Sequence, residues 1–193
     1  MNKTHKVFVT YLILAVNVAV FLWLSFTGSV SDSYFMAAHG ALISEDVISG
    51  KWYELFTSMF LHFGAEHLAG NMIVLIAVGV PLEKVIGPVR YFLIYIISGL
   101  AGNILSVALE LASGEYAVSA GASGAVLGLM GSVIYVMIRH RGYIGGLSLP
   151  RVILAVVITL YTGFRGAGIN NAAHIGGLIC GFVLTVILYH PKN

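Results

Sequence analysis

The stretch SGAVLGLMGSVIYVMI, residues 123–138, is the clearest indication of the fold class of this chain. Its sixteen residues carry no charge, and at about 1.5 Å per residue they form a helix of roughly 24 Å. The hydrocarbon core of a bilayer is about 30 Å thick, so such a helix nearly crosses it. Gly124, Gly128 and Gly131 have the spacing of small residues at which membrane helices pack closely. The stretch therefore predicts a short, tightly packed membrane helix.

The composition extends this interpretation to the whole chain. Hydrophobic residues make up 59% of the 193 residues and charged residues only 9%, whereas a soluble domain carries about 25% charged residues. These values indicate a polytopic membrane protein. The formal net charge of +2 gives no sign of a nucleic-acid partner. Cys180 is the single cysteine, so no internal disulfide is possible, and we expect it to pack as a small side chain.

Six apolar stretches predict an all-α bundle of six transmembrane helices, which we expect to form a single domain over residues 1–193. Their approximate limits are 7–26, 67–82, 91–109, 123–138, 147–164 and 172–189. The first could be taken for a signal peptide, because Lys3 and Lys6 precede it. Its apolar run is long for that role and no small-residue cleavage motif follows, so we interpret it as a helix. The fifth is the least regular, because Pro150 and Arg151 interrupt its beginning.

Residues 28–66 form the one long connection between these helices. The segment mixes charged residues with apolar stretches such as 34–36. It contains no uncharged run long enough to cross a bilayer. We therefore predict a folded loop that lies partly in the membrane interface.

The basic residues predict how the helices are oriented, because cytoplasmic loops of membrane proteins carry an excess of lysine and arginine. If the N-terminus is inside, eight basic residues fall on the inner side and two on the outer side. The inner residues are Lys3, Lys6, Lys84, Arg90, Arg139, Arg141, Arg151 and Lys192, and the outer ones are Lys51 and Arg165. Both termini are then cytoplasmic, and the long loop at about 28–66 faces outward.

Polar side chains from three of the predicted helices fall at one depth. Ser123 begins the fourth helix, while His174 and His67 each stand fifteen residues, or roughly 22 Å, before the inner end of theirs. Asn71 follows His67 by one turn on the same helix face. Polar groups are costly in hydrocarbon, so several at one level predict a functional site that opens outward.

Ser123 and His174 suggest nucleophilic catalysis, although a serine in a membrane helix more often bonds its own backbone or packs as a small residue. Gly177 and Gly181 predict that the His174 helix packs closely against a neighbour. If that neighbour is the Ser123 helix, the serine and histidine can meet directly. A serine hydroxyl needs such a base, and no Asp or Glu falls at this depth to orient the histidine. The sequence therefore favours a dyad over a triad.

The developing negative charge on an attacked carbonyl oxygen also has candidate partners. The first backbone N–H groups of a helix are unpaired, and Ser123 stands at such a helix start. His67 and Asn71 can supply side-chain donors to the same oxygen. Metal chemistry is not indicated, because no cluster of Cys and His has ligand spacing.

These residues resemble the motifs of the rhomboid intramembrane serine proteases. The resemblance runs from about residue 40 to residue 185. The motifs that carry it are His62-x4-His67-x3-Asn71, Leu82-Glu83-Lys84-x2-Gly87, Gly121-Ala122-Ser123-Gly124 and Ala173-His174-x2-Gly177-x3-Gly181. The serine tetrapeptide alone is a weak signal, whereas the four motifs together are specific.

The resemblance implies Ser123 as nucleophile, His174 as base, and His67 and Asn71 as donors to the oxyanion. It also implies a six-helix bundle with a water-filled cavity open to the outside, in the minimal form found in bacterial cell membranes. No cofactor is implied. The substrates would be single-span membrane proteins in the lipid bilayer, cut near small, helix-breaking residues.

Two positions depart from the pattern of the family. Family members commonly carry an aromatic–arginine pair in the first loop, and this chain has Tyr53-Glu54 there. Many relatives carry a tyrosine four residues after the serine, where it packs on the histidine, and this chain has Leu127. Glu54 in place of arginine should change how the first loop is braced. Leu127 in place of tyrosine should hold His174 less firmly in its orientation.

Two other functions remain open at this point. The chain could be an inactive rhomboid-like protein that binds membrane clients, although it retains both Ser123 and His174. It could also be a small-solute transporter, since transporters carry polar groups at the bilayer midplane. The chain shows no evident inverted repeat, and its polar groups lie toward the outer half, which weighs against transport.

The orientation can be tested by cysteine accessibility labelling. In sealed cells we expect an impermeant reagent to label cysteines placed at positions 46 and 115, and to leave positions 2 and 192 unlabelled, because of the excess of inner basic residues. Labelling of position 192 from outside would contradict the orientation.

Overall fold

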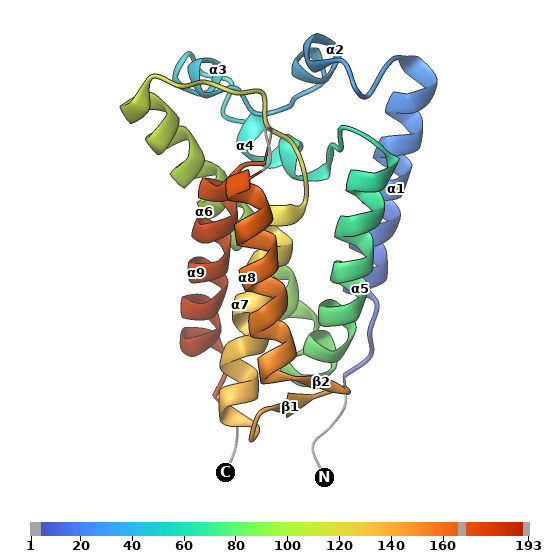
Figure 1. Ribbon diagram of the computed structural model, residues 1–193. Helices are drawn as coiled ribbons and strands as arrows, with labels where there is room; N and C mark the ends of the chain where they lie inside the picture. The colour runs from blue at the N-terminus through green and yellow to red at the C-terminus, as the bar shows by residue number, and fades with distance from the viewer. Residues whose placement is uncertain (1–4, 166–168, 191–193) are drawn as a thin grey trace.

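The computed structural model describes residues 5–165 and 169–190, and helices make up most of this part of the chain (Figure 1). In chain order the elements are α1 (Val9–Thr27), α2 (Ser33–Ala38), α3 (Ser44–Ile48), α4 (Glu54–Thr57), the 3-10 helix η1 (Ser58–Phe60), α5 (Ala65–Ile86), α6 (Pro88–Ser113), α7 (Ser123–Arg139), β1 (Tyr143–Ile144), β2 (Leu147–Ser148), α8 (Leu149–Arg165) and α9 (Asn171–Leu188). The helix α1 begins and α9 ends at the same end of the bundle.

The six long helices coincide with the six apolar stretches expected from the sequence, with every end within four residues. Among the described residues, α1, α5, α6 and α9 are long and apolar enough to cross a membrane. The helices α7 and α8 are apolar but shorter. The prediction of a helical, polytopic membrane protein is thus confirmed, whereas the count of six spans stays a prediction.

A small β-hairpin between α7 and α8 departs from the expected all-α fold. Its strands are antiparallel, with Tyr143 opposite Ser148 and Ile144 opposite Leu147. The turn uses Gly145 and Gly146, both with positive φ, which glycine adopts without steric cost. The fifth helix therefore begins at Leu149, because the two residues before it belong to the hairpin.

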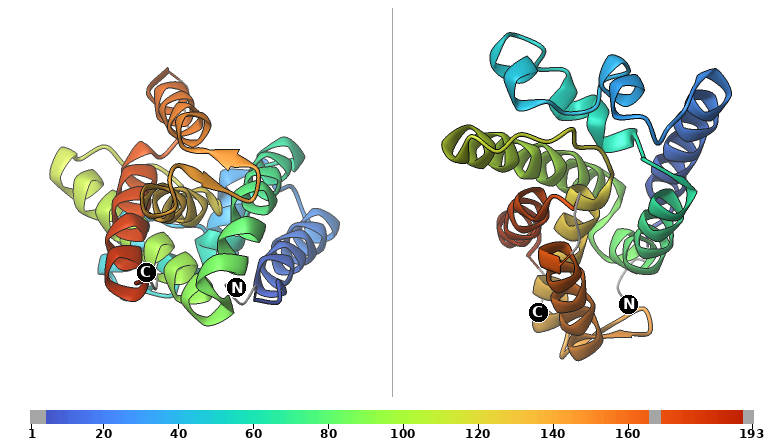
Figure 2. Two further views of the ribbon diagram at one scale, coloured as in Figure 1. Left: turned by 90° about the horizontal axis from the view of Figure 1, so that it is seen from below. Right: turned by 45° about the horizontal axis from the view of Figure 1, so that its top comes forward.

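The helix α7 forms the centre of the molecule. Viewed along the bundle, it is surrounded by α5, α6, α8 and α9, while α1 packs on the outside against α5 (Figure 2, left). Most residues of α7 are buried, among them Leu129, Val133 and Met137 with no exposed surface. Because protein surrounds α7, this helix does not need the length of a lipid-facing span.

Glycines bring the backbones of α7 and α9 into direct contact. A Cβ atom at Gly177 would collide with the carbonyl oxygen of Gly124, and one at Gly181 with that of Gly128. Such close approach is possible only where both helices present small residues. The expectation from the glycine spacing is confirmed, and the partner helix is the one that begins at Ser123.

A buried hydroxyl pair fixes the register of the same two helices. Ser132 Oγ on α7 donates to the carbonyl oxygen of Gly181 at 3.0 Å and lies 3.1 Å from that of Gly128. Thr185 Oγ1 on α9 lies 2.7 Å from Ser132 Oγ and from the Gly181 carbonyl oxygen. With no water in hydrocarbon to replace these bonds, sliding α9 along α7 would leave polar groups unpaired.

Glu83 on α5 is fully buried and holds the beginning of α1. Its carboxylate accepts the backbone N–H groups of Phe8, Val9 and Thr10 at 2.8–3.0 Å and the Thr10 hydroxyl at 2.7 Å. The first N–H groups of a helix have no partner within the helix, and a carboxylate there is favourable. Glu83 therefore lies inside the helix α5, which continues to Ile86, four residues beyond its expected end.

The connection 28–66 is folded, as expected, and covers the end of the bundle opposite to the start of α1 (Figure 2, right). It contains α2, α3, α4 and η1, and its Met36, Ala41 and Leu61 pack with Leu24 of α1 in a small core. Large aromatic side chains such as Tyr34 and Trp52 are exposed on it. Aromatic residues concentrate where membrane meets water, so its position in the interface remains our prediction.

The substitution Gly181→Ala tests the contact between α7 and α9. The added methyl group meets the Gly128 backbone, so we expect a loss of roughly 1–3 kcal/mol in the free energy of unfolding. Gly70→Ala in α5 is the matched control, because a Cβ there has open space, and alanine favours a helix over glycine. Chemical unfolding in detergent measures both, and equal stability of the two variants would contradict the packing.

Candidate active site

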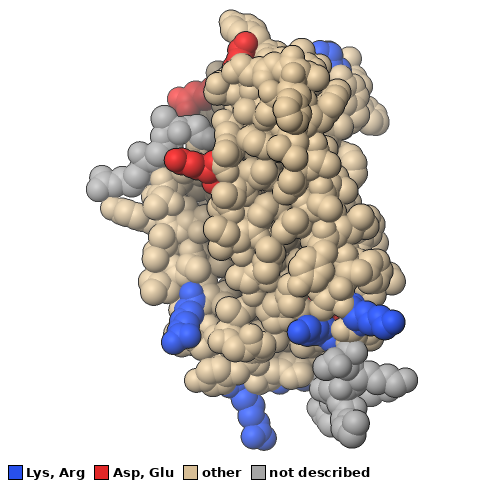
Figure 3. All heavy atoms as spheres, turned by 90° about the vertical axis from the view of Figure 1, so that its right-hand side faces the viewer, with Lys and Arg blue, Asp and Glu red and all other residues tan. Residues whose placement is uncertain are grey.

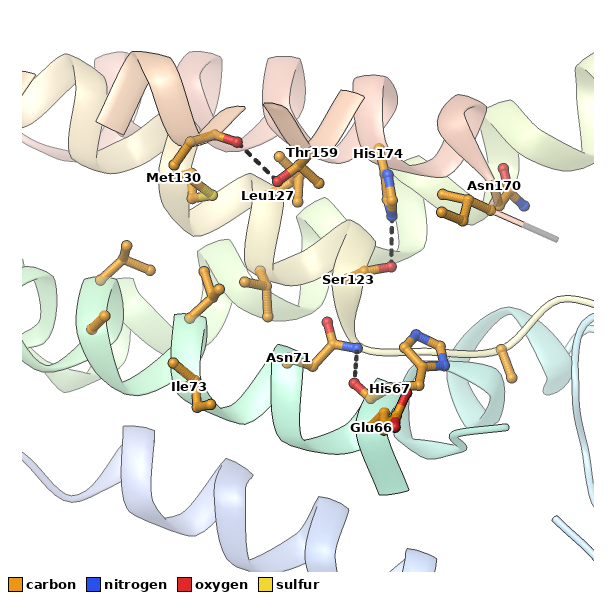
Figure 4. A pocket seen from close by; sticks show the side chains of 18 of the residues that line it. Glu66, His67, Asn71, Ile73, Ser123, Leu127, Met130, Thr159, Asn170 and His174 are labelled. Atoms are coloured by element: carbon orange, nitrogen blue, oxygen red, sulfur yellow. Dashed lines mark hydrogen bonds between the residues drawn. The ribbon is translucent and has the colours of Figure 1, made fainter. Parts of the chain in front are cut away.

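Ser123 and His174 meet where α7 and α9 begin. Ser123 is the first residue of α7, and His174 lies in the first turn of α9. Ser123 Oγ is 2.8 Å from Nε2 of His174, so the hydroxyl can donate to a lone pair on that nitrogen (Figure 4). The His174 side chain is only 5% exposed. The arrangement joins a potential nucleophile to a potential base.

The other ring nitrogen of His174 meets no acceptor. Nδ1 is buried and has no hydrogen-bond partner within residues 5–165 and 169–190. A Ser–His–Asp triad would place a carboxylate at that atom. In the described part of the chain the geometry is therefore that of a two-residue pair, and packing rather than a carboxylate orients the ring. Leu127, which is 3% exposed, lines the same cavity.

Asn170 caps the helix that carries His174 and ties it to two other segments. Its Oδ1 accepts the backbone N–H of Ala173 at 2.9 Å. Its Nδ2 donates to Ser106 Oγ on α6 at 2.5 Å and to Ser119 Oγ at 3.1 Å. The sequence analysis missed this residue. An asparagine directly before a helix is a recognised N-cap signal, so the position could have been found, but its two hydroxyl partners could not.

The backbone before Ser123 adopts, at Gly121, a conformation that favours glycine. Gly121 has φ +142, and its N–H donates to the carbonyl oxygen of Ser58 at 2.9 Å. A Cβ at Gly121 would lie 2.8 Å from the His67 ring. Asn103 braces the same turn, since its Nδ2 donates to Ser58 Oγ at 3.0 Å. Gly121 thereby lets the His67 ring approach the start of α7.

His62 supports the same turn from the loop before α5. It is fully buried, and its Nε2 lies 3.4 Å from the Ala122 backbone N, as acceptor of that N–H. Its ring meets the His67 ring edge to face, with centroids 5.0 Å apart. Burial, and secondarily the nearby His67, lowers the pKa of His62 to about 3. The ring is thus neutral at pH 7 and keeps the lone pair that accepts the Ala122 N–H.

His67 and Asn71 face Ser123 and His174 across a shared cavity (Figure 4). They stand one turn apart on α5, which places them on one face of the helix. Nδ2 of Asn71 donates to the His67 carbonyl oxygen at 3.0 Å, which occupies one of its two N–H groups. The structure therefore brings all four candidate residues from the sequence to one cavity, and leaves Asn71 a second hydrogen for another acceptor.

The cavity has a volume of about 700 Å³ and lies between α5 and α8. Its walls come from α5, α7, α8, the start of α9 and the extended segment 118–120. Polar groups gather at its end near the starts of α7 and α9, whereas the part nearer the hairpin is lined mainly by side chains such as Val78, Met130 and Val152. Within the described residues no group of three His, Cys, Asp or Glu side chains is placed to hold a metal ion.

Glu54, which stands where the resemblance leads one to expect arginine, is buried in the covering loop. Its side chain is 1% exposed, and Oε2 accepts the Ile43 N–H at 3.1 Å. Its Oε1 has no hydrogen-bond partner in the described part of the chain. Burial raises the pKa of this carboxyl, and the charge of Asp46 acts in the same direction. The Glu54 carboxylate thus braces the loop as a hydrogen-bond acceptor, although burying its negative charge costs stability.

The chain is similar to known proteins over most of its length. The model of the Rhomboid domain family matches residues 49–191. The chain is 36% identical to Rhomboid protease GluP of Bacillus subtilis over 183 residues, which are 95% of this chain and 35% of GluP. It is 42% identical to RHOMBOID-like protein 6, mitochondrial, of Arabidopsis thaliana over 80% of this chain and 50% of that protein.

A further relative is matched along more of its own length. Putative rhomboid protease YdcA of Bacillus subtilis is 30% identical over 180 residues, which are 89% of this chain and 85% of YdcA. The chain therefore spans about a third to a half of the first two relatives and most of the third.

The substitution Glu54→Gln tests the cost of the buried carboxylate. Because the folded state raises the pKa of Glu54, it binds the proton more tightly than the unfolded state, and its stability falls as pH rises through the folded pKa. We expect Glu54→Gln to raise the unfolding midpoint at pH 8, and the gain to shrink toward pH 4. Glu45→Gln, an exposed change in α3, serves as control. A Glu54→Gln effect independent of pH would contradict this account.

Proposed function

The chain belongs to the rhomboid family, and on that premise we propose that it is an intramembrane serine endopeptidase that cleaves transmembrane segments of other membrane proteins with a Ser–His dyad. The observation that carries the proposal is the 2.8 Å approach of Ser123 Oγ to His174 Nε2 beside a cavity. Without a neighbouring base, a serine at a helix start would be too weak a nucleophile to attack a peptide bond.

In the proposed reaction, Ser123 Oγ attacks the carbonyl carbon of the scissile peptide while its proton passes to His174 Nε2. The C–O bond forms, the carbonyl electron pair moves onto oxygen, and a tetrahedral intermediate results. His174 then gives the proton to the leaving nitrogen as the C–N bond breaks. Water, deprotonated by His174, hydrolyses the ester on Ser123 and restores both side chains.

Three donors around the cavity suit the negative charge on the tetrahedral oxygen. The backbone N–H of Ser123 is among the first of α7 and has no partner within the helix. His67 and the second N–H of Asn71 come from α5, on the opposite wall. Removing one such donor in soluble serine proteases costs about a hundred- to a thousand-fold in rate. We therefore assign His67 and Asn71 to the oxyanion site.

We propose that all six long helices cross the bilayer, with both termini cytoplasmic and residues 1–193 as one membrane domain. The described Lys and Arg side chains other than Lys51 belong to segments at the end where α1 begins, and the acidic residues other than the buried Glu83 gather at the opposite end (Figure 3). This separation supports the expected orientation in a bacterial cell membrane. Lys3 and Lys192 lie outside the described residues, as does the side chain of Arg165.

Single-span membrane proteins are the proposed substrates, and they would enter between α5 and α8. Apart from Val152 and Val156, which are buried, much of α8 presents exposed apolar side chains. The backbone must be extended near Ser123, because a helix keeps its carbonyls in internal hydrogen bonds. Segments with glycine or proline near their outer end unwind at lower cost, which favours them as substrates.

A fluorophosphonate probe distinguishes this proposal from the two alternatives, a client-binding rhomboid-like protein and a transporter. Such a probe forms a bond only with an activated serine. We expect labelling of the wild-type chain in lipid and its loss in Ser123→Ala. If no detergent or lipid condition gives labelling of a folded chain, the catalytic proposal is wrong and a binding function is favoured.

Replacing different residues of the site should reduce the rate of cleavage by different amounts. Ser123→Ala and His174→Ala should abolish detectable cleavage of a single-span substrate in liposomes, because both take part in the bond-making step. His67→Ala and Asn71→Ala should each slow cleavage by about a hundred-fold or less, since the oxyanion donors are shared. For the variant with both substitutions, the increase in activation free energy should be smaller than the sum of the two single increases, because both side chains act on one oxygen.

Thermal unfolding of each variant provides the control for folding. Full activity in a folded His174→Ala variant would remove His174 as the base and overturn the mechanism.

A further inference from the structure

Arg151 on α8 is the one Lys or Arg side chain that lines the cavity in the described part of the chain. It forms no hydrogen bond or ion pair with any described residue. It stands two residues after the beginning of α8, at the inner end of the bundle. Its side chain is exposed, and an arginine near a helix end extends toward the membrane interface, where lipid headgroups lie. The structure thus presents an unpaired guanidinium at the inner end of a membrane cavity.

An apolar slot leads from Arg151 toward the candidate active site. Arg151, Ala155 and Thr159 are four residues apart, so they form one face of α8, and all three line the cavity. This face is about 12 Å long. On the opposite wall, α5 presents apolar side chains that include Ile73 and Ala77. The slot therefore has a charged inner end and a long apolar wall.

The hairpin closes the inner end of this slot. Leu147 of β2 lines the cavity, and Gly145 lies so close to Pro81 of α5 that a Cβ atom would collide with it. The hairpin therefore bridges the bottom of the gap between α5 and α8. A lipid can reach the slot from the membrane side, between the two helices.

We propose that an anionic phospholipid of the inner leaflet binds in this slot, with its phosphate on Arg151 and an acyl chain between α5 and α8. Arginine binds phosphate through paired N–H donors, and acyl chains match the apolar wall. The inner leaflet carries the anionic lipids of a cell membrane. The inner flank of a single-span protein is instead rich in Lys and Arg, which Arg151 would repel.

The bound lipid would occupy the inner half of the cavity that a substrate helix has to enter. A substrate must then displace it, so anionic lipid should act as a competitor of substrate. This consequence rests on the proposed protease function, whereas lipid binding itself rests only on the proposed orientation in the membrane.

Native mass spectrometry of the full chain tests the binding with two lipids of identical acyl chains, phosphatidylglycerol and phosphatidylcholine. We expect the wild-type chain to retain one phosphatidylglycerol in preference to phosphatidylcholine. Arg151→Gln should lower that retention about fivefold, the effect of one basic residue at an anionic surface. Arg139→Gln removes the same charge from an exposed site at the inner end of α7 that does not line the cavity, and it should change nothing.

Two further variants separate the headgroup from the acyl chain. Arg151→Lys keeps the charge and should retain most of the binding. Ala155→Phe keeps Arg151 but fills the slot from an exposed position, so it should also lower retention. Ser123→Ala should bind lipid as the wild type does, which separates a failure of this proposal from a failure of the proposed protease function.

Three results would overturn the proposal: equal losses in Arg151→Gln and Arg139→Gln, no preference for phosphatidylglycerol, or full retention in Ala155→Phe. If Arg151→Gln keeps its lipid but changes the cleavage of substrates with an acidic inner flank, the partner of Arg151 is a protein segment instead.

Discussion

The contact between the backbones of α7 and α9 is the constraint on which the rest of this structure depends. Gly177 and Gly181 lie against the carbonyl groups of Gly124 and Gly128, where a Cβ atom on either would collide. In lipid, where apolar surfaces gain nothing by meeting each other, such close packing and interhelical hydrogen bonds supply the association. The same contact brings the first turns of the two helices together, and with them Ser123 Oγ and His174 Nε2 at 2.8 Å.

The helices and the candidate residues could be predicted from the sequence because both signals are local. Apolar runs mark the helices, and the spacing of Gly177 and Gly181 predicts a close neighbour. The rest depends on contacts between distant segments. Nothing near Glu83 in the sequence shows that its carboxylate holds the start of α1. Likewise, the hydroxyl partners of Asn170 lie far from it in the chain.

The site combines a rigid wall with a loosely packed one, which suits the proposed entry of a helix from the membrane. Ser123 and His174 belong to the glycine-packed pair α7 and α9, and the turn before Ser123 is held by Ser58 and His62. The opposite side of the cavity is different, since most of the apolar side chains of α8 are exposed and only Val152 and Val156 are buried. Catalysis requires fixed positions for the reacting groups, which α7 and α9 provide. Entry of a substrate requires space, which α8 provides.

The most direct test of the central claim is an experimental structure of the chain after reaction with a fluorophosphonate in lipid. The account predicts continuous density from Ser123 Oγ to phosphorus, with the phosphoryl oxygen within hydrogen-bond reach of the Ser123 N–H and of His67 or Asn71. His174 Nε2 should remain beside Ser123 Oγ. An adduct on another residue, or a His174 ring turned away from Ser123 while α7 and α9 stay packed, would contradict the account.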